Sequence, residues 1–169
     1  LLPGAGGTQR LPRLIGLRKA LPLLLEGRTL GVAQAREQGL VDAVVPAEQL
    51  LDAACAWVAE QTEPVTQPWD RKGFKLPGGM PDPVGIYGIF AMETARISAR
   101  TQNKLPAPRH ILSAVFEGYS TDIDSGLKAE RRHFVGCACS SASKNIIRTS
   151  FFGVNDAAKL KHRPAGVPP

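Results

Sequence analysis

The chain has 169 residues, of which 43% are hydrophobic and 21% are charged, and it carries a formal net charge of +6. This balance is typical of a soluble globular protein with one domain or two smaller pieces. No apolar run approaches the roughly 20 residues that cross a bilayer, which argues against a membrane-spanning class. Because the first residue is Leu and no basic segment precedes an apolar one, we expect a truncated N-terminus rather than a targeting sequence.

The positive charge is unevenly distributed along the chain. Residues 1–60 carry six Lys or Arg and six Asp or Glu residues, so the excess lies entirely in residues 61–169. A basic surface can meet nucleic acid, anionic lipid or an acidic cofactor such as coenzyme A, and the simpler alternative is a solvated face. We expect the three cysteines to be reduced thiols and the three isolated histidines to be packed or exposed rather than metal ligands.

Residues 1–16, LLPGAGGTQRLPRLIG, have an order more specific than their composition. Pro3 has a fixed φ and is followed by three glycines within four residues, which predicts a turn leading into a helix that begins near Thr8. The bare amides of such a turn can bind an anion or a polarised carbonyl. The alternative is a tight turn packed on a neighbouring helix. A P-loop is excluded because no Lys-Ser/Thr pair follows, and Gln9 replaces the third glycine of a dinucleotide fingerprint.

The helix that begins near Thr8 should end at Gly16, and apolar spacing predicts further helices at residues 18–26, 32–38 and 47–60. Pro22 is tolerable in the first of these only if that helix starts late. Residues 40–45 are short, rich in β-branched side chains and bounded by Gly and Pro, which predicts a strand.

The second half of the chain is predicted to be helical after a linker. Residues 61–83 hold five prolines and three glycines. A helix then begins at Asp82-Pro83 and ends before Pro106, and another covers residues 108–118.

We expect the last long helix to be capped by Thr121 and Asp122 and to continue through Ile147. Phe151 and Phe152 are interpreted as anchors for a final turn, and the tail KHRPAGVPP as extended.

Two stretches resemble known proteins. LLPGAGGTQRLPRLIG followed by LLEGRTLGVAQAREQGLVDAVVP resembles the second half of a crotonase-fold enzyme of the enoyl-CoA hydratase family, from residue 1 to about residue 60. QPWDRKGFKLPGG and the helices up to FFGVNDAAKL resemble the connector of multifunctional fatty-acid oxidation alpha subunits, which lies before a 3-hydroxyacyl-CoA dehydrogenase domain.

The resemblance implies a mainly α-helical chain with one short strand, the C-terminal part of an α/β crotonase (ClpP/crotonase-like) fold plus a helical connector. Its expected divisions are residues 1–60 for the hydratase part, residues 61–83 for the linker and residues 84–169 for the connector. The connector helix after Thr121 either packs over the hydratase cleft and shapes the acyl tunnel or is a spacer.

The implied reaction is hydration of 2-enoyl-CoA to 3-hydroxyacyl-CoA in fatty-acid beta-oxidation, in a parent enzyme that also carries the dehydrogenase. In the family, the two catalytic glutamates and the main oxyanion turn precede the glycine-rich turn, and the dinucleotide-binding turn would follow Pro169. We therefore expect an internal piece without catalytic residues that is inactive by itself. The carboxylates of Glu26, Glu37 and Glu48 are expected to be solvated.

The resemblance implies a substrate-binding role for the glycine-rich turn, beside the acyl group and the reacting carbon. The residues expected to line that pocket are Pro3, Gly4, Ala5, Gly6 and Gly7, and the alternative for each is pure packing. Gln9 and Arg10 are expected to be structural, with a carboxylate partner for Arg10 elsewhere in the chain or on the missing half of the hydratase domain.

No cofactor is expected in this segment: a coenzyme A thioester is the substrate, and NAD belongs to the dehydrogenase domain. The implied partners are acyl-CoA, the rest of the polypeptide and a thiolase subunit, in the cytoplasm, without nucleic acid or a membrane span. One alternative is a non-catalytic helical scaffold that docks other domains. Another is a basic nucleic-acid binder, which lacks support because no helix-turn-helix or aromatic stacking pattern accompanies the charge. In an isolated chain, we expect the first helices to expose apolar faces.

Overall fold

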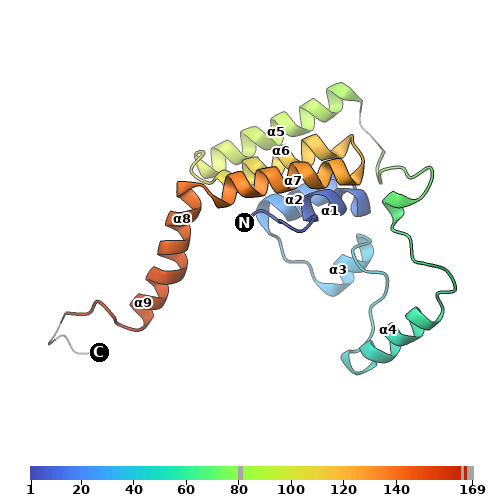
Figure 1. The fold of residues 1–169 in the computed structure, drawn as a ribbon, viewed down its shortest axis with the longest axis horizontal. Helices are drawn as coiled ribbons and strands as arrows, with labels where there is room; N and C mark the ends of the chain where they lie inside the picture. The colour runs from blue at the N-terminus through green and yellow to red at the C-terminus, as the bar shows by residue number, and fades with distance from the viewer. Residues whose placement is uncertain (80–81, 165, 167–169) are drawn as a thin grey trace.

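The computed structural model describes residues 1–79, 82–164 and 166. Helices dominate these residues, and the central body of the molecule is built by α1 (Gly7–Ile15), α2 (Leu17–Glu26), α5 (Pro83–Thr101), α6 (Pro106–Tyr119) and α7 (Ile123–Ala138). Two segments extend from the body (Figure 1). One contains α3 (Val32–Glu37), the 3-10 turn η1 (Ala47–Gln49) and α4 (Leu50–Ala59), and the other contains α8 (Ser141–Ile147), the π-helical turn η3 (Arg148–Gly153) and α9 (Val154–Ala158).

The apolar core lies where α2, α5 and α6 meet. Leu21, Ile97 and Ile111, one from each of these helices, are at most 2% exposed and belong to one cluster. Leu76, from the segment between the 3-10 turn η2 (Pro68–Asp70) and α5, packs against the same cluster. The expectation that the first helices expose their apolar faces is therefore wrong for α2, because the connector helices cover it.

The break between α1 and α2 depends on Gly16. Its φ of +84° lies in the left-handed region, and a Cβ there would come within 2.5 Å of the Pro77 carbonyl oxygen. The expectation that α2 starts late is wrong, because α2 begins at Leu17 and contains Pro22 as its sixth residue. Burial of four α2 side chains offsets the lost hydrogen bond.

The predicted strand at residues 40–45 is wrong: these residues form neither a strand nor a ladder in the described part of the chain. A strand needs a partner for its backbone groups, and β-branched composition alone does not supply one. The helices predicted on either side are present as α3 and α4, but neither contains a buried residue. The apolar face of α4 is exposed, with Leu51 73% and Trp57 50% exposed.

The aspartate caps predicted for the long helices are confirmed, but Thr121 does not cap α7, because its hydroxyl donates to carbonyls instead of accepting from an amide. The Asp82 carboxylate accepts from the Gly85 amide at 2.5 Å, and Asp122 accepts from the Ser125 amide at 2.8 Å. The prediction that the last helix runs on to Ile147 is wrong, because α7 ends at Ala138. The Ser140 hydroxyl accepts from the Ser143 amide at 3.1 Å and caps the new helix α8.

The arm formed by α8, η3 and α9 has no buried residue. Phe151 and Phe152 are therefore not anchors: they are 61% and 57% exposed and contact each other with ring centroids 5.2 Å apart. The predicted linker and tail each include positions outside the described residues, namely 80–81 in the linker and 165 and 167–169 in the tail. Among the described residues, no helix combines the length and apolarity that crossing a membrane requires.

Candidate functional site

The glycine-rich turn, residues 3–7, precedes α1 and lies against α7. Gly6 is buried with a φ of +92°, whereas Gly4 and Ala5 are exposed. A Cβ on Gly4 would come within 2.8 Å of the Phe134 ring, and one on Gly6 within 3.0 Å of the Leu127 side chain. The glycines therefore allow the backbone of the turn to lie directly on one face of α7.

A carboxylate from α7 occupies the amides of this turn. Glu130 Oε1 accepts from the Gly6 amide at 2.5 Å, and Oε2 accepts from the Thr8 amide at 2.8 Å and from the Thr8 hydroxyl at 2.6 Å. Glu130 is 1% exposed. The amides at the start of α1 thus bind an anion, as we predicted from the glycine-rich turn, and this anion is a side chain of the same polypeptide.

The role of Glu130 was not predicted from the sequence, although a signal was present. Ile123, Leu127 and Phe134 are spaced for one face of a helix, and residue 130 falls on that face. An acidic residue in the middle of an apolar face requires a buried partner. Here the partner is a set of backbone amides more than 120 residues earlier in the sequence.

Gln9 fastens α1 to α6. Its Nε2 donates to the Ala114 carbonyl at 2.8 Å and to the Thr8 hydroxyl at 3.1 Å, and the residue is 1% exposed. A Cβ at Gly118 or Gly126 would overlap the Gln9 side chain, so both glycines leave room for it. The structural role expected for Gln9 is therefore confirmed.

Arg13 binds the carboxyl end of α6. Its Nη2 donates to the carbonyls of Gly118 and Thr121 at 2.8 and 2.9 Å, and its Nη1 donates to the Gln9 carbonyl at 3.0 Å. The last carbonyls of a helix lack partners within it and favour a cation. Burial lowers the pKa of Arg13, and the charge of Asp122 partly opposes this shift.

Two other expectations concern charged residues. Within the described residues, Arg10 donates to the Ala5 carbonyl at 2.8 Å, and the carboxylate partner expected for it elsewhere stays a prediction. Glu26, expected to be solvated, has a side chain only 12% exposed and forms ion pairs with Arg28, Arg96 and Arg100 at 2.5, 2.6 and 3.7 Å. The hydrogen bond from Arg28 is the main cause that lowers the pKa of Glu26. Because Arg96 and Arg100 belong to α5, Glu26 joins α2 to α5.

Another polar contact, built around two histidines, joins α6 to α7. Nδ1 of His110 lies 3.2 Å from Nδ1 of His133, whose Nε2 lies 2.8 Å from Glu117 Oε1. Arg132 also binds Glu117. Burial and the nearby charge of His133 lower the pKa of His110. Burial acts to raise the pKa of Glu117, but the hydrogen bonds and charges of His133 and Arg132 bring it below its ordinary value.

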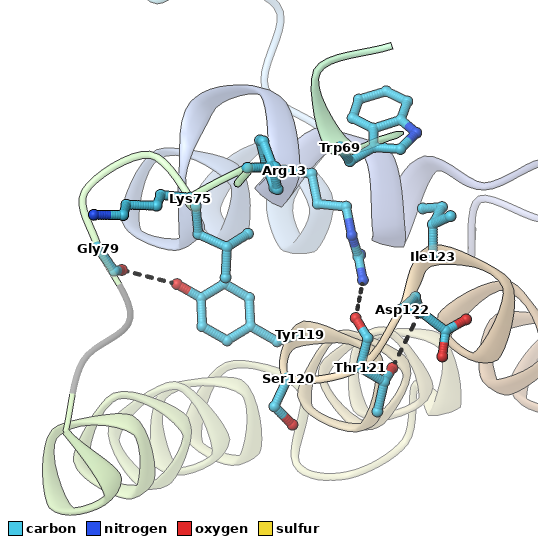
Figure 2. A pocket seen from close by; sticks show the side chains of 11 residues that line it. Arg13, Trp69, Lys75, Gly79, Tyr119, Ser120, Thr121, Asp122 and Ile123 are labelled. Carbon is cyan, nitrogen blue, oxygen red and sulfur yellow. Dashed lines mark hydrogen bonds between the residues drawn. The ribbon is translucent and has the colours of Figure 1, made fainter. Parts of the chain in front are cut away.

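A pocket of about 430 Å³ lies on another side of α1, between Trp69 and the α6–α7 turn. Figure 2 shows Arg13 reaching to the Thr121 carbonyl on one side and the Tyr119 hydroxyl donating to the Gly79 carbonyl, at 3.2 Å, on the other. Burial raises the pKa of Tyr119. None of residues 3–7 lines this pocket, so their expected role in substrate binding stays a prediction.

The described residues contain no group of three or more His, Cys, Asp or Glu side chains that could hold a metal ion. Within the same residues, the buried carboxylate near the turn is Glu130, and its oxygens already accept three hydrogen bonds. The arrangement around the turn is therefore suited to fixing a backbone shape rather than to proton transfer.

Residues 1–67, which include the glycine-rich turn, match a known protein family. The model of the family "Enoyl-CoA hydratase/isomerase" matches residues 1–67. The chain is 38% identical over 159 residues to the fatty acid oxidation complex subunit alpha of Shewanella loihica, and 40% identical over 162 residues to that of Shewanella amazonensis. Each alignment covers 94% of this chain but only 22% of the relative, so the chain spans about a fifth of the length of these curated relatives. Residues 1–67, with the glycine-rich turn and α1, are therefore similar to the enoyl-CoA hydratase/isomerase family, in a chain that is similar over 94% of its length to one stretch of fatty acid oxidation complex alpha subunits.

Proposed function

We propose that residues 1–67 form one part of an enoyl-CoA hydratase site in a fatty-acid oxidation enzyme. The reaction adds water across the double bond of a 2-enoyl-CoA thioester and gives 3-hydroxyacyl-CoA. It needs a carboxylate to activate water, an acid to protonate the α-carbon and donors for the enolate oxygen. The observation that carries this proposal is the family match over the glycine-rich turn and α1.

We assign to the turn a shaping role in that site rather than an oxyanion role. The amides of Gly6 and Thr8 donate to Glu130, so they are not free to bind an enolate oxygen. Gly4 and Ala5 are exposed, so a thioester's acyl group can lie against bare backbone there. The acid and base carboxylates are then supplied from outside this chain.

The wider setting of the reaction is also a proposal, supported by the similarity to fatty acid oxidation complex alpha subunits. A 3-hydroxyacyl-CoA dehydrogenase activity in the same polypeptide would oxidise the product with NAD, and this chain would hold no cofactor of its own. A thiolase subunit would be the partner of the complex, in the cytoplasm. The scaffold alternative is supported by the uncovered apolar faces of α4 and the α8–α9 arm, which can dock other domains.

The test is a hydration assay on the full-length gene product with crotonyl-CoA, in which loss of the conjugated thioester's absorbance is followed. We expect hydration by that product and none by the 169-residue chain alone. Gly4→Val should lower kcat/KM by about tenfold or more, because the side chain must displace Phe134 or enter the acyl pocket.

Gly31→Val is the matched control, because a Cβ there meets only the Gln34 side chain, at 3.9 Å, and its φ of −67° is open to any residue. Absence of hydration by the full-length gene product would overturn the enzyme proposal and leave the scaffold function.

A further inference from the structure

One face of α7 carries three residues that fix the glycine-rich turn. Phe134 lies under Gly4, Leu127 lies against Gly6, and Glu130 between them binds the amides of Gly6 and Thr8. Figure 1 shows α7 alongside α1, at the start of which the turn lies. The contacts therefore come from a helix outside the family-matched residues 1–67.

The two oxygens of Glu130 are divided between two points of the turn. Oε1 accepts from the Gly6 amide, whereas Oε2 accepts from the amide and the hydroxyl of Thr8. A planar carboxylate that binds amides two residues apart fixes the peptide planes between them, including Gly6 in its left-handed conformation. Because Glu130 is 1% exposed, water cannot readily replace these bonds.

We propose that Glu130 is a positioning residue for the acyl pocket: from the connector, it sets the shape of the turn that the acyl chain contacts. This inference rests on the proposed hydratase function. It assigns part of the enzyme's acyl-chain selectivity to a residue that lies more than 60 positions beyond the family-matched segment.

Two substitutions remove different parts of this contact. Glu130→Gln keeps the shape of the side chain but turns an NH₂ group toward an N–H or O–H donor, so one donor on the turn loses its acceptor. Thr8→Val removes the hydroxyl bond to Oε2 and the bond that this hydroxyl accepts from Gln9 Nε2, and it leaves both amide bonds in place. Thr8→Ser keeps the hydroxyl and serves as the rescuing variant. Glu37→Gln, at an exposed carboxylate on α3, is the matched control.

The experiment measures kcat and KM of the full-length gene product with a short substrate, crotonyl-CoA, and a long one, decenoyl-CoA. For Glu130→Gln we expect the ratio of kcat/KM between the two substrates to change by about tenfold, chiefly through a higher KM for decenoyl-CoA. Thr8→Val should change it in the same direction by a smaller factor, and Thr8→Ser and Glu37→Gln should leave it within about twofold.

A second readout does not depend on activity. Hydrogen exchange at the Gly6 and Thr8 amides of the full-length gene product should quicken by about tenfold or more in Glu130→Gln, while exchange in the core of α6 stays unchanged. Faster exchange throughout the body would mean that Glu130 only stabilises the fold and would overturn the proposal.

Equal loss of kcat/KM on both substrates with KM unchanged would also overturn it, because a smaller folded fraction has that effect. If Glu130→Gln does not fold, Thr8→Val decides by the same two readouts. An inactive wild-type enzyme would overturn the hydratase function instead, and the exchange experiment alone would then decide whether Glu130 fixes the turn.

Discussion

The body of the molecule and its two extended segments use similar helices in different ways. In α2, Leu17, Leu21 and Leu25 are at most 8% exposed, whereas Leu50 and Leu51 of α4 are 63% and 73% exposed. Both helices are mainly apolar, with five leucines and one alanine in α2 and two leucines and four alanines in α4, so apolar content alone does not explain the difference. The body helices also meet through buried polar side chains at fixed positions, and no residue of α4 or of the α8–α9 arm is buried. The spacing of apolar residues thus favours a helix, but the helix is buried only where another surface fits its apolar face.

The largest effect should come from a cavity in the core of the body. Leu21→Ala removes a side chain that is 2% exposed and should lower the free energy of unfolding by about 2–5 kcal/mol. Urea unfolding of the 169-residue chain, followed by circular dichroism, measures this loss. Leu51→Ala on α4 is the matched control and should cost less than about 0.5 kcal/mol. Similar losses for the two variants would contradict the distinction between the body and the extended segments.

A smaller effect should follow from filling the space reserved for Gln9. Gly118→Ala places a Cβ on the Gln9 amide, which cannot move without losing its bond to the Ala114 carbonyl, so we expect a loss of about 1–3 kcal/mol. Gly88→Ala, in α5, meets open space and should instead stabilise the chain by about 0.5–1 kcal/mol. Opposite signs in urea unfolding would confirm the buried polar contact, and two stabilising alanines would refute it.

Much of the body could be predicted from the sequence. The glycine-rich turn, both capping aspartates and nearly all helices follow from local chemistry, because caps and apolar spacing act within a few residues. The strand at residues 40–45 could not be judged in this way, since a strand depends on a partner elsewhere. The same holds for the end of α7, where Ser140 capped a new helix instead of continuing the old one.

The sequence predicted the turn of the candidate site but not the side chain that the turn binds. The turn and its anion-binding amides follow from the glycines and Thr8, but the identity of the anion depends on a fold that brings residue 130 beside residue 6. The resemblance drew attention to catalytic glutamates and to Glu26, Glu37 and Glu48, whereas Glu130 was concealed within an apolar pattern. Its long separation in sequence is the physical reason that local chemistry could not identify it.

The half-exposed contact between α6 and α7 should respond to pH, unlike the fully apolar core. The pKa of His110 lies below its ordinary 6.5 in the folded chain, so below that pH the unfolded chain binds the extra proton and stability falls as the pH decreases. The depressed pKa of Glu117 gives stability that is present above its ordinary 4.5 and is lost as the pH falls through the lower folded value.

Urea midpoints measured across the acid range test both losses of stability. His110→Gln should remove the loss at higher pH, which we assign to His110, and retain the loss at lower pH, which we assign to Glu117. If the loss at higher pH persists in this variant, His110 is not its source.

The smallest effect on stability should come from the exposed apolar face of α4, although its effect on surface properties should be large. Trp57→Gln replaces a side chain that is 50% exposed, and we expect the free energy of unfolding to stay within about 0.5 kcal/mol of wild type. Binding of a dye that fluoresces on apolar surface should nevertheless decrease, because Trp57 belongs to a patch that no other described residue covers. A loss of stability comparable to that of Leu21→Ala, with dye binding unchanged, would mean that α4 folds back onto the body in solution.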